Sequence, residues 1–237
     1  MLSLTDVSKS FGALKVADNV SFELAEGGAL GIIGPNGAGK STLFNLITGN
    51  LAVDAGLIAF NGMDITRMPP MRRCHAGLGR TFQIPQPFEK LTVFENLLVA
   101  AAYGSNRGEA EVSDRCAEIL VETALIERAN QPAGSLSLLQ RKRLELARAL
   151  ATDPRLLLLD EIAGGLTEGE CAELVETIRA IHCGGTSIIW IEHVLHALNA
   201  LVEQLLVLDF GKVIAMGPVD EVMASRQVRD VYLGIEV

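Results

Sequence analysis

The stretch GIIGPNGAGKST, residues 31–42, places glycine, lysine and serine at a spacing that could hold phosphate. The pattern G-x-x-x-x-G-K-[ST], in which backbone N–H groups surround phosphate oxygens, is matched by Gly34, Gly39, Lys40 and Ser41. In this pattern the lysine reaches the β- and γ-phosphates, and the serine hydroxyl supplies an oxygen ligand for Mg²⁺. The alternative is a glycine-rich turn that binds nothing. The elements on either side decide between the two interpretations.

Two carboxylates follow four leucines in LLLLDE, residues 156–161. The leucines predict a buried strand that carries Asp160 and Glu161 at its C-terminal end, which is where ligands bind in open α/β sheets. There Asp160 would hold Mg²⁺, and Glu161 would orient or deprotonate a water that attacks the γ-phosphate. Two solvated acids at a strand end are the alternative, and the phosphate pattern elsewhere in the chain favours the functional interpretation.

The pattern around the glycine stretch predicts the elements that would position it. Alternating apolar residues at 20–24 and the run ALGII at 29–33 indicate two strands separated by a turn. Apolar spacing from Lys40 predicts a helix that stops at Gly49. The order strand, glycine loop, helix would put phosphate at the helix N-terminus, where the macrodipole supplies roughly half a positive charge.

Composition indicates a globular protein, since 49% of the 237 residues are apolar and 21% are charged. The apolar runs, such as TSIIWI at 186–191, fall far short of the roughly 20 residues that a bilayer span needs. The start MLSLTDVSKSFG has neither the basic region nor the apolar region of a signal peptide, so we expect the chain to stay in the cytosol.

Charge and cysteine spacing exclude other classes of function. With 20 Lys and Arg against 29 Asp and Glu, the net charge of −9 disfavours nonspecific binding to nucleic acid or to an anionic membrane. Any membrane role is therefore expected to depend on a protein partner. The four cysteines are scattered, without the spacing of a disulfide framework or a zinc site.

Along nearly its whole length the chain resembles the nucleotide-binding subunit of an ATP-binding cassette (ABC) transporter. Besides GPNGAGKST and LLLLDE, the matches are Phe11 in KSFGALKV, Gln83 in GRTFQ and His193 in IIWIEH. The resemblance implies that Phe11 stacks on adenine, that Gln83 is the glutamine of the Q-loop, and that His193 contacts the γ-phosphate. A core aromatic, a polar loop residue and a strand-end imidazole are the alternatives, and the order and spacing of the matches count against them.

The resemblance implies an ATPase that converts ATP and water to ADP and phosphate with the help of Mg²⁺. Contacts with ATP are expected from Phe11, Gly34, Asn36, Gly37, Gly39, Lys40, Ser41 and Thr42. The implied catalytic residues are Glu161, His193 and Gln83, and the implied ligands of Mg²⁺ are Ser41, Gln83 and Asp160.

The implied fold is α/β, with a P-loop NTPase core that contains a mixed sheet, an antiparallel β edge and an inserted α-helical subdomain. Residues 1–237 would form a single ABC ATPase domain, with its nucleotide-binding core at 1–85 and 151–237. The helical subdomain would cover 86–150, a stretch dense in Leu, Ala, Glu and Arg.

The segment GSLSLLQRKRLELARAL, which begins at Gly134, occupies the family's signature position but departs from its L-S-G-G-Q pattern. Leu138 and Leu139 replace both glycines, so close approach of a phosphate to the main chain is lost. Ser137 and Gln140 remain as the candidate signature contacts, and their spacing predicts a capping box at a helix N-terminus. An ordinary capped surface helix is the alternative.

A second departure follows Glu161, where the family has a proline and then a turn that ends in L-D or L-N. Ile162 replaces the proline and Thr167 replaces the carboxylate or amide. We therefore assign no function to these two positions.

Three short segments resemble the branched-chain amino acid importer branch of the family: RTFQIPQPFEKLTVFENLLVAA, EHV and the ending VYLG. Importers of urea, amides and aromatic acids share nearly the same segments and remain alternatives. Another alternative is a regulatory ABC protein that binds ATP with little hydrolysis. A soluble ABC protein that acts on ribosomes or DNA is disfavoured by the acidic balance and by the single cassette.

The implied partners are transmembrane permease subunits, a second ATPase subunit in a homodimer or heterodimer, and, indirectly, an extracytoplasmic solute-binding protein. The permease would dock on the segment after Gln83, where Pro85, Pro87 and Phe88 give a stiff and partly apolar surface. The chain would then lie at the cytoplasmic face of the membrane, held there by the permease. No nucleic acid partner is expected.

Overall fold

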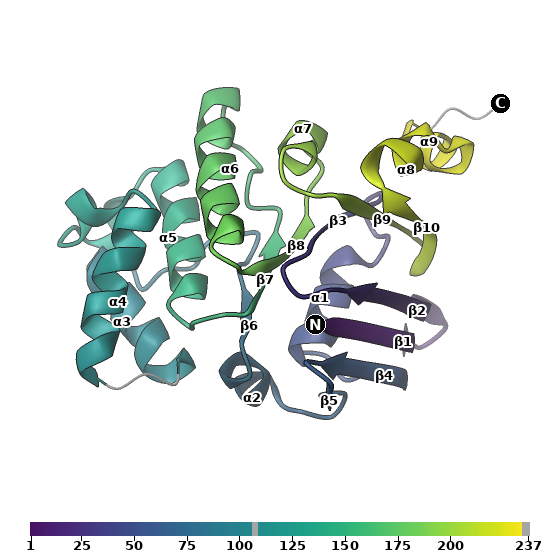
Figure 1. The fold of residues 1–237 in the computed structure, drawn as a ribbon, viewed down its shortest axis with the longest axis horizontal. Helices are drawn as coiled ribbons and strands as arrows, with labels where there is room; N and C mark the ends of the chain where they lie inside the picture. The colour runs from purple at the N-terminus through teal and green to yellow at the C-terminus, as the bar shows by residue number, and fades with distance from the viewer. Residues whose placement is uncertain (106–108, 234–237) are drawn as a thin grey trace. The chain divides into compact units, whose positions relative to one another are not determined.

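The computed structural model describes residues 1–105 and 109–233, except the side chains of residues 109, 110, 232 and 233. Of the ending VYLG, the backbone of residues 231–233 is described and Gly234 lies outside the described residues. The chain forms two compact units, the first made of Met1–Arg73 with Ile188–Val237 and the second of Cys74–Ser187 (Figure 1). The boundaries expected for the helical subdomain, residues 86–150, remain a prediction.

In the first unit an antiparallel sheet contains the predicted strand at 20–24. Its strands, in the order β2-β1-β4-β5, are β2 (Leu14–Leu24), β1 (Leu2–Phe11), β4 (Ala55–Phe60) and β5 (Met63–Asp64). Apolar side chains of one face, such as Leu4, Val20 and Ile58, are buried. The alternation seen in the sequence thus reflects a sheet with one buried face.

The first unit also contains the strand that precedes the glycine stretch. This strand belongs to a group of paired strands that run in both directions. Here β3 (Ala29–Ile33) pairs in parallel with β8 (Ser187–Ile191) and with β9 (Gln204–Asp209), and β10 (Lys212–Pro218) pairs antiparallel to β9. All residues of β3 and β8 are buried, as expected for continuous apolar runs in parallel strands. The predicted strand at 29–33 is confirmed, and so is a mixed sheet in an α/β fold.

Helix α1 (Lys40–Thr48) follows β3 and ends at the residue that the sequence predicts. Gly49 caps it in the left-handed conformation, with φ of 78°. The Arg73 guanidinium donates to the carbonyls of Leu46 and Ile47, at 2.7 Å each, and so satisfies the last turn. The other helices of this unit are α7 (Leu195–Asn199), α8 (Val219–Ala224) and α9 (Arg226–Leu233), and α2 (Pro70–His75) runs across the boundary between the units.

The second unit combines two parallel strands with a largely helical segment. Strand β6 (Leu78–Arg80) pairs with β7 (Leu156–Asp160), whose four leucines are fully buried. The helices are α3 (Val93–Gly104), α4 (Glu109–Glu122), α5 (Leu138–Leu150) and α6 (Glu168–Cys183), with short 3₁₀ turns at Ile126–Arg128 and Ala133–Ser135. The buried strand predicted before the two acids is confirmed, and so is the mostly helical character of the described residues between 86 and 150.

The described residues contain no helix that combines the length and the apolar character required to cross a bilayer.

Candidate active site

The glycine loop connects the end of β3 at Ile33 to the start of α1 at Lys40, and two of its glycines, Gly34 and Gly39, stand in close contact with other backbone. A Cβ on Gly34 would lie 2.1 Å from the carbonyl oxygen of Leu208, and a Cβ on Gly39 would lie 2.4 Å from that of Val16. Gly39 also has φ of 101°. Only glycine fits both requirements, so the glycines predicted from the sequence have a structural cause.

Lys40 lies across this loop. Its ammonium Nζ donates to the carbonyls of Gly34, at 2.8 Å, and Pro35, at 3.0 Å, and the residue is buried. Asn36 and Gly37 are exposed at the loop, Ser41 is exposed in the first helical turn, and Thr42 is half-buried. The helix therefore presents its N-terminus and a lysine beside backbone N–H groups, which is the arrangement that binds phosphate.

Phe11 ends β1 and the residue is 53% exposed, so the aromatic predicted to stack on adenine is available to a ligand rather than buried in the core. The ammonium of Lys9 lies 5.7 Å from the centre of this ring and is itself bonded to Asp54, at 2.6 Å. A ring with an exposed face at the end of a strand can accept a base by stacking.

Asp160, in the second unit, has one carboxylate oxygen engaged and one with no donor. Its Oδ2 accepts from the Arg80 guanidinium at 2.8 Å, whereas Oδ1 is buried and has no hydrogen-bond partner among the described residues. A buried carboxylate oxygen without a donor is costly. Its chemistry fits a ligand for a hard cation such as Mg²⁺.

The predicted residues Gln83 and Glu161 come together in the second unit, where the side-chain amide of Gln83 donates to the carboxylate of Glu161. Glu161 is buried and has a left-handed backbone, with φ of 47°, which is uncommon for a residue other than glycine. The ammonium of Lys142 donates to the carbonyls of Gln83, at 2.9 Å, and of Glu161, at 3.2 Å. The same buried lysine thus holds the backbone on both sides of the pair.

Sequence reasoning missed Lys142. Helix α5 carries it four residues before the buried Leu146, and Lys142 is only 4% exposed. A lysine on the apolar face of an amphipathic helix was the available signal, since lysine is rarely buried unless its charge is paired or hydrogen-bonded.

His193 lies in the first unit, in the loop after β8. Its side chain is exposed, and its backbone N–H donates to the carboxylate of the fully buried Glu192, at 3.2 Å. The histidine predicted to contact the γ-phosphate is therefore accessible to a ligand.

The capping box predicted at the signature position is confirmed. Gln140 N–H donates to the Ser137 hydroxyl at 3.4 Å, and Ser137 N–H donates to the Gln140 side-chain oxygen at 3.0 Å. Leu138 is 47% exposed in the first turn, and a Cβ placed on Gly165 would lie 3.4 Å from its side chain. The helix start thus presents an apolar side chain where the family pattern has glycine.

The two residues to which no function was assigned have structural roles. Ile162 is fully buried, and the Thr167 hydroxyl accepts from Glu170 N–H at 3.3 Å to cap α6. Sequence reasoning missed this cap, although the T-x-x-E spacing was visible.

Three features define a phosphate-loop nucleotide-binding protein. They are a glycine loop between a buried strand and a helix, an exposed aromatic at the end of β1, and acids that end another buried strand. The model of the family described as "ABC transporter" matches residues 17–164. The chain therefore belongs to the ABC transporter family, and it is an ATPase of that family.

The curated relatives cover nearly the whole chain. The probable branched-chain amino acid transport ATP-binding protein LivG of Methanocaldococcus jannaschii is 34% identical over 253 residues, which cover 99% of this chain and 97% of that protein. The high-affinity branched-chain amino acid transport ATP-binding protein LivG of Escherichia coli strain K12 is 33% identical over 249 residues, with 99% and 98% covered.

Solved structures agree on the fold. A nucleotide-free ATP-binding cassette from an ABC transporter superposes with a TM-score of 0.91 at 33% identity and covers 99% of both chains. An ATP-binding cassette in its ADP conformation gives a TM-score of 0.91 at 34% identity, again over 99% of both chains. The P-loop NTPase fold implied by the sequence is confirmed.

Proposed function

We propose that this chain is the ATP-hydrolysing subunit of a membrane importer for branched-chain amino acids. The observation that supports branched-chain amino acids as the solute is the near-full-length similarity to the two LivG proteins, which are named for that transport. The observation that supports hydrolysis is Glu161, whose buried carboxylate is hydrogen-bonded by Gln83 at the end of β7. A protein that only bound ATP would have no need to hold a carboxylate in this position.

The residues of the site fit Mg²⁺ as the metal that accompanies ATP. Oxygen donors are available in the exposed Ser41 hydroxyl and in Oδ1 of Asp160, which has no donor among the described residues, and Gln83 adds an amide oxygen. Mg²⁺ prefers such oxygen ligands. When bound, it would neutralise negative charge on the β- and γ-phosphates.

Each remaining site residue has a role that follows from its chemistry. The glycine loop and Lys40 bind the phosphates, and Phe11 stacks on the base. Glu161 orients the attacking water and accepts its proton, while Gln83 fixes the orientation of that carboxylate. The contacts of the remaining loop residues Asn36, Gly37 and Thr42 with ATP, and of His193 with the γ-phosphate, are part of the same proposal.

The permease is proposed to bind the second unit at a cavity that follows the Q-loop glutamine. This cavity has a volume of about 400 Å³ and is lined by Phe82, Ile84, Gln86, Glu145 and Arg148. Ile84 is 70% exposed, so an apolar side chain lies open at its rim. The exposed apolar surface suits a short helix of a permease subunit, which would hold the chain at the cytoplasmic face of the membrane.

A charged pair lies under this apolar rim. Arg148 donates to the Glu145 carboxylate at 3.2 Å and to the Gln86 carbonyl at 2.9 Å, and its guanidinium lies 5.5 Å from the centre of the Phe88 ring. Burial raises the pKa of the Glu145 carboxyl, and Arg148 opposes that rise. These contacts hold the segment between Gln83 and Phe88 in place.

A second ATPase subunit and an extracytoplasmic solute-binding protein complete the proposed transporter. The altered signature gives a reason to expect a partner different from this chain. In a pair, ATP at Lys40 would meet the partner's signature, and ATP at the partner's loop would meet Leu138 and Leu139. If the partner keeps its glycines, the two ATP sites are unequal.

Solute uptake in a strain from which this gene is deleted tests the function. Uptake of radiolabelled leucine, isoleucine and valine should fall, and it should return with the parent gene but not with the Glu161→Gln variant. Uptake of urea, amides and aromatic acids is measured in parallel. Loss of one of those uptakes with branched-chain uptake intact would contradict the proposed solute and favour a related importer.

A further inference from the structure

The phosphate loop rests on a hairpin that belongs to none of the nucleotide-binding motifs. Strands β9 and β10 form this hairpin, and Gly211 lies in the turn between them. Gly211 N–H donates to the carbonyl of Ala38 in the loop, at 2.9 Å, and Gly211 carbonyl accepts from Asp18 N–H of β2, at 2.8 Å. One turn residue therefore joins the phosphate loop to the antiparallel sheet through its backbone.

The backbones meet at this point without room for a side chain. A Cβ on Gly211 would lie 2.8 Å from the carbonyl carbon of Val16 and 3.1 Å from the nitrogen of Ala17. A Cβ on Gly39 would lie 2.4 Å from the Val16 oxygen and 3.7 Å from the Cα of Gly211. Since real Cβ atoms do not approach other atoms as closely as 2.4 or 2.8 Å, either substitution has to move backbone of the loop or of β2.

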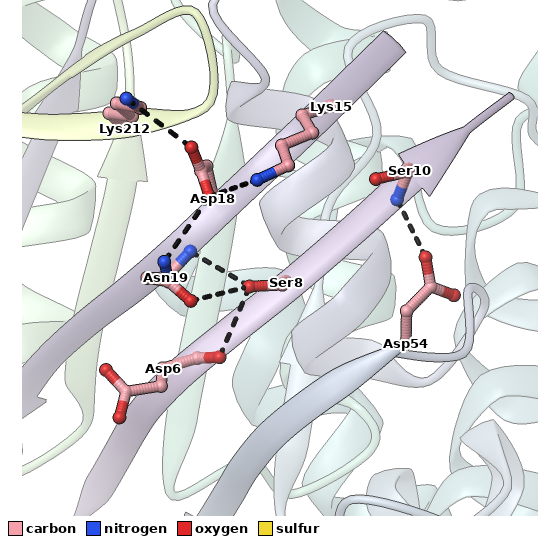
Figure 2. A network of polar contacts seen from close by, with 8 residues as sticks. All are labelled: Asp6, Ser8, Ser10, Lys15, Asp18, Asn19, Asp54 and Lys212. Atoms are coloured by element: carbon pink, nitrogen blue, oxygen red, sulfur yellow. Dashed lines mark hydrogen bonds and ion pairs between the residues drawn. The ribbon is translucent and has the colours of Figure 1, made fainter. Parts of the chain in front are cut away.

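Side chains add a second connection at the same place, shown in Figure 2. Asp18 accepts from Lys15, at 3.0 Å, and lies 3.4 Å from the ammonium of Lys212, the residue after Gly211. Asn19 also donates to Asp18, at 3.4 Å. Lys15 and Lys212 are both exposed, so each ion pair contributes little, and the backbone bonds of Gly211 determine the geometry.

The turn is also held in a conformation that its sequence disfavours. Phe210 has φ of 42°, although the left-handed region is unfavourable for a bulky residue, and the residue is 81% exposed. The ring gains little from burial at that exposure. The next residue, Gly211, makes the backbone bonds that join this turn to the phosphate loop and to β2.

We propose that Gly211 is a positioning residue of the nucleotide site, which holds Ala38 and Gly39 in the conformation that receives phosphate. The inference rests on the proposed binding of ATP at the loop. Gly211 touches no substrate in this account, and it acts through the loop backbone alone. Its effect is therefore expected on the binding of the phosphate chain, whether or not a base is attached.

Gly62 provides a matched control. It follows the left-handed Asn61 in the β4–β5 turn, as Gly211 follows Phe210, and the two glycines have φ of 77° and 76°. A Cβ on Gly62 would meet no atom within 4 Å. Gly62→Ala therefore carries the same backbone strain as Gly211→Ala, without the collision at Val16.

The experiment measures equilibrium binding of ATP and of inorganic tripolyphosphate to the full chain and to both variants, with folding checked by circular dichroism. For Gly211→Ala we expect Kd to rise at least about 10-fold for both ligands, and for Gly62→Ala to stay within about twofold of the parent. A lower Tm with unchanged Kd for Gly211→Ala would overturn the proposal. So would an equal loss in Gly62→Ala, or a loss for ATP but not for tripolyphosphate.

A second measurement uses the parent chain and covers the case in which Gly211→Ala does not fold. Amide hydrogen exchange at Gly211 reports on its bond to Ala38, and we expect saturating tripolyphosphate to slow it at least about 10-fold. Unchanged exchange at saturation would overturn the proposal. If the parent bound neither ATP nor tripolyphosphate, the proposed function would fail first, and this inference with it.

Discussion

The side-chain amide of Gln83 donates a hydrogen bond to the carboxylate of Glu161, although the two residues are far apart in the sequence. Both belong to the second unit, and the ammonium of Lys142 holds their backbone carbonyls. Glu161 is therefore held at two points, through its side-chain carboxylate and through its backbone carbonyl. Because the three residues share these bonds, the loss of one is expected to disturb the other two.

Lys142→Met tests the contribution of the buried ammonium. The variant removes two hydrogen bonds from a charged donor, one of them buried and one part-buried, so the free energy of unfolding should fall by about 2 kcal/mol. Turnover of ATP should fall more than ATP affinity, because the left-handed backbone of Glu161 loses its support. Urea unfolding and steady-state kinetics measure both effects. Lys90→Met, which changes an exposed lysine of the same unit, is the control, and equal effects of the two variants would contradict this role.

Restoring glycine at Leu138 and Leu139 should raise the ATPase activity of the assembled complex. Two backbone N–H groups would regain access to phosphate, each charge-assisted bond contributing roughly 1.5 to 3 kcal/mol. Helix propensity opposes the change by about 1 kcal/mol per glycine, less near the cap that Ser137 provides. Phosphate release has to be measured in the full complex, since the gain depends on closure of the site. Equal or lower turnover in a folded variant would show that the leucines are tolerated.

Asp54→Asn should make folding less sensitive to acid. Hydrogen bonds from Lys9, at 2.6 Å, and from Ser10 N–H, at 2.8 Å, lower the pKa of the Asp54 carboxyl below its ordinary value of 3.8. A lowered folded pKa contributes stability that is present above about pH 3.8 and is lost as the pH falls through the folded value. Urea unfolding at pH 7 should therefore separate the parent from the variant. The difference should disappear as the pH falls below that range, and a constant difference at all pH values would contradict the linkage.

Lys40→Ala should weaken ATP binding by about 10- to 100-fold, because a charge-assisted contact with the β- and γ-phosphates is lost. The variant also removes the two bonds from Nζ to the carbonyls of Gly34 and Pro35, which a folding check by circular dichroism monitors. Equilibrium binding of a fluorescent ATP analogue with Mg²⁺ present measures the effect. Unchanged affinity would contradict phosphate binding by the loop.

Local signals predicted much of the fold. The strand at 29–33, the helix from Lys40 to its stop at Gly49 and the buried strand before Asp160 all appear where the sequence indicated. Their ends depend on glycine geometry, helix capping and continuous apolar runs, which are properties of a few neighbouring residues. The capping box at Ser137 was predictable for the same reason.

Contacts between distant segments were not predictable. Arg80 bonds Asp160, Lys142 bonds the carbonyls of Gln83 and Glu161, and Gly211 bonds Ala38, each across many residues of sequence. Such contacts depend on how the elements pack, and no local spacing encodes them. The LLLLDE pattern supplied Glu161 and the family resemblance supplied Gln83 as site residues, whereas the bond between them came from the structure.

The rate of ATP hydrolysis by the assembled complex, compared between the parent and Glu161→Gln, tests the central claim most directly. The substitution keeps size and hydrogen bonding but removes the negative charge that orients and deprotonates the water. We expect ATP binding to be retained and turnover to fall by roughly 10²- to 10⁴-fold. Turnover within about twofold of the parent, in a variant that still binds ATP, would contradict Glu161 as the catalytic carboxylate.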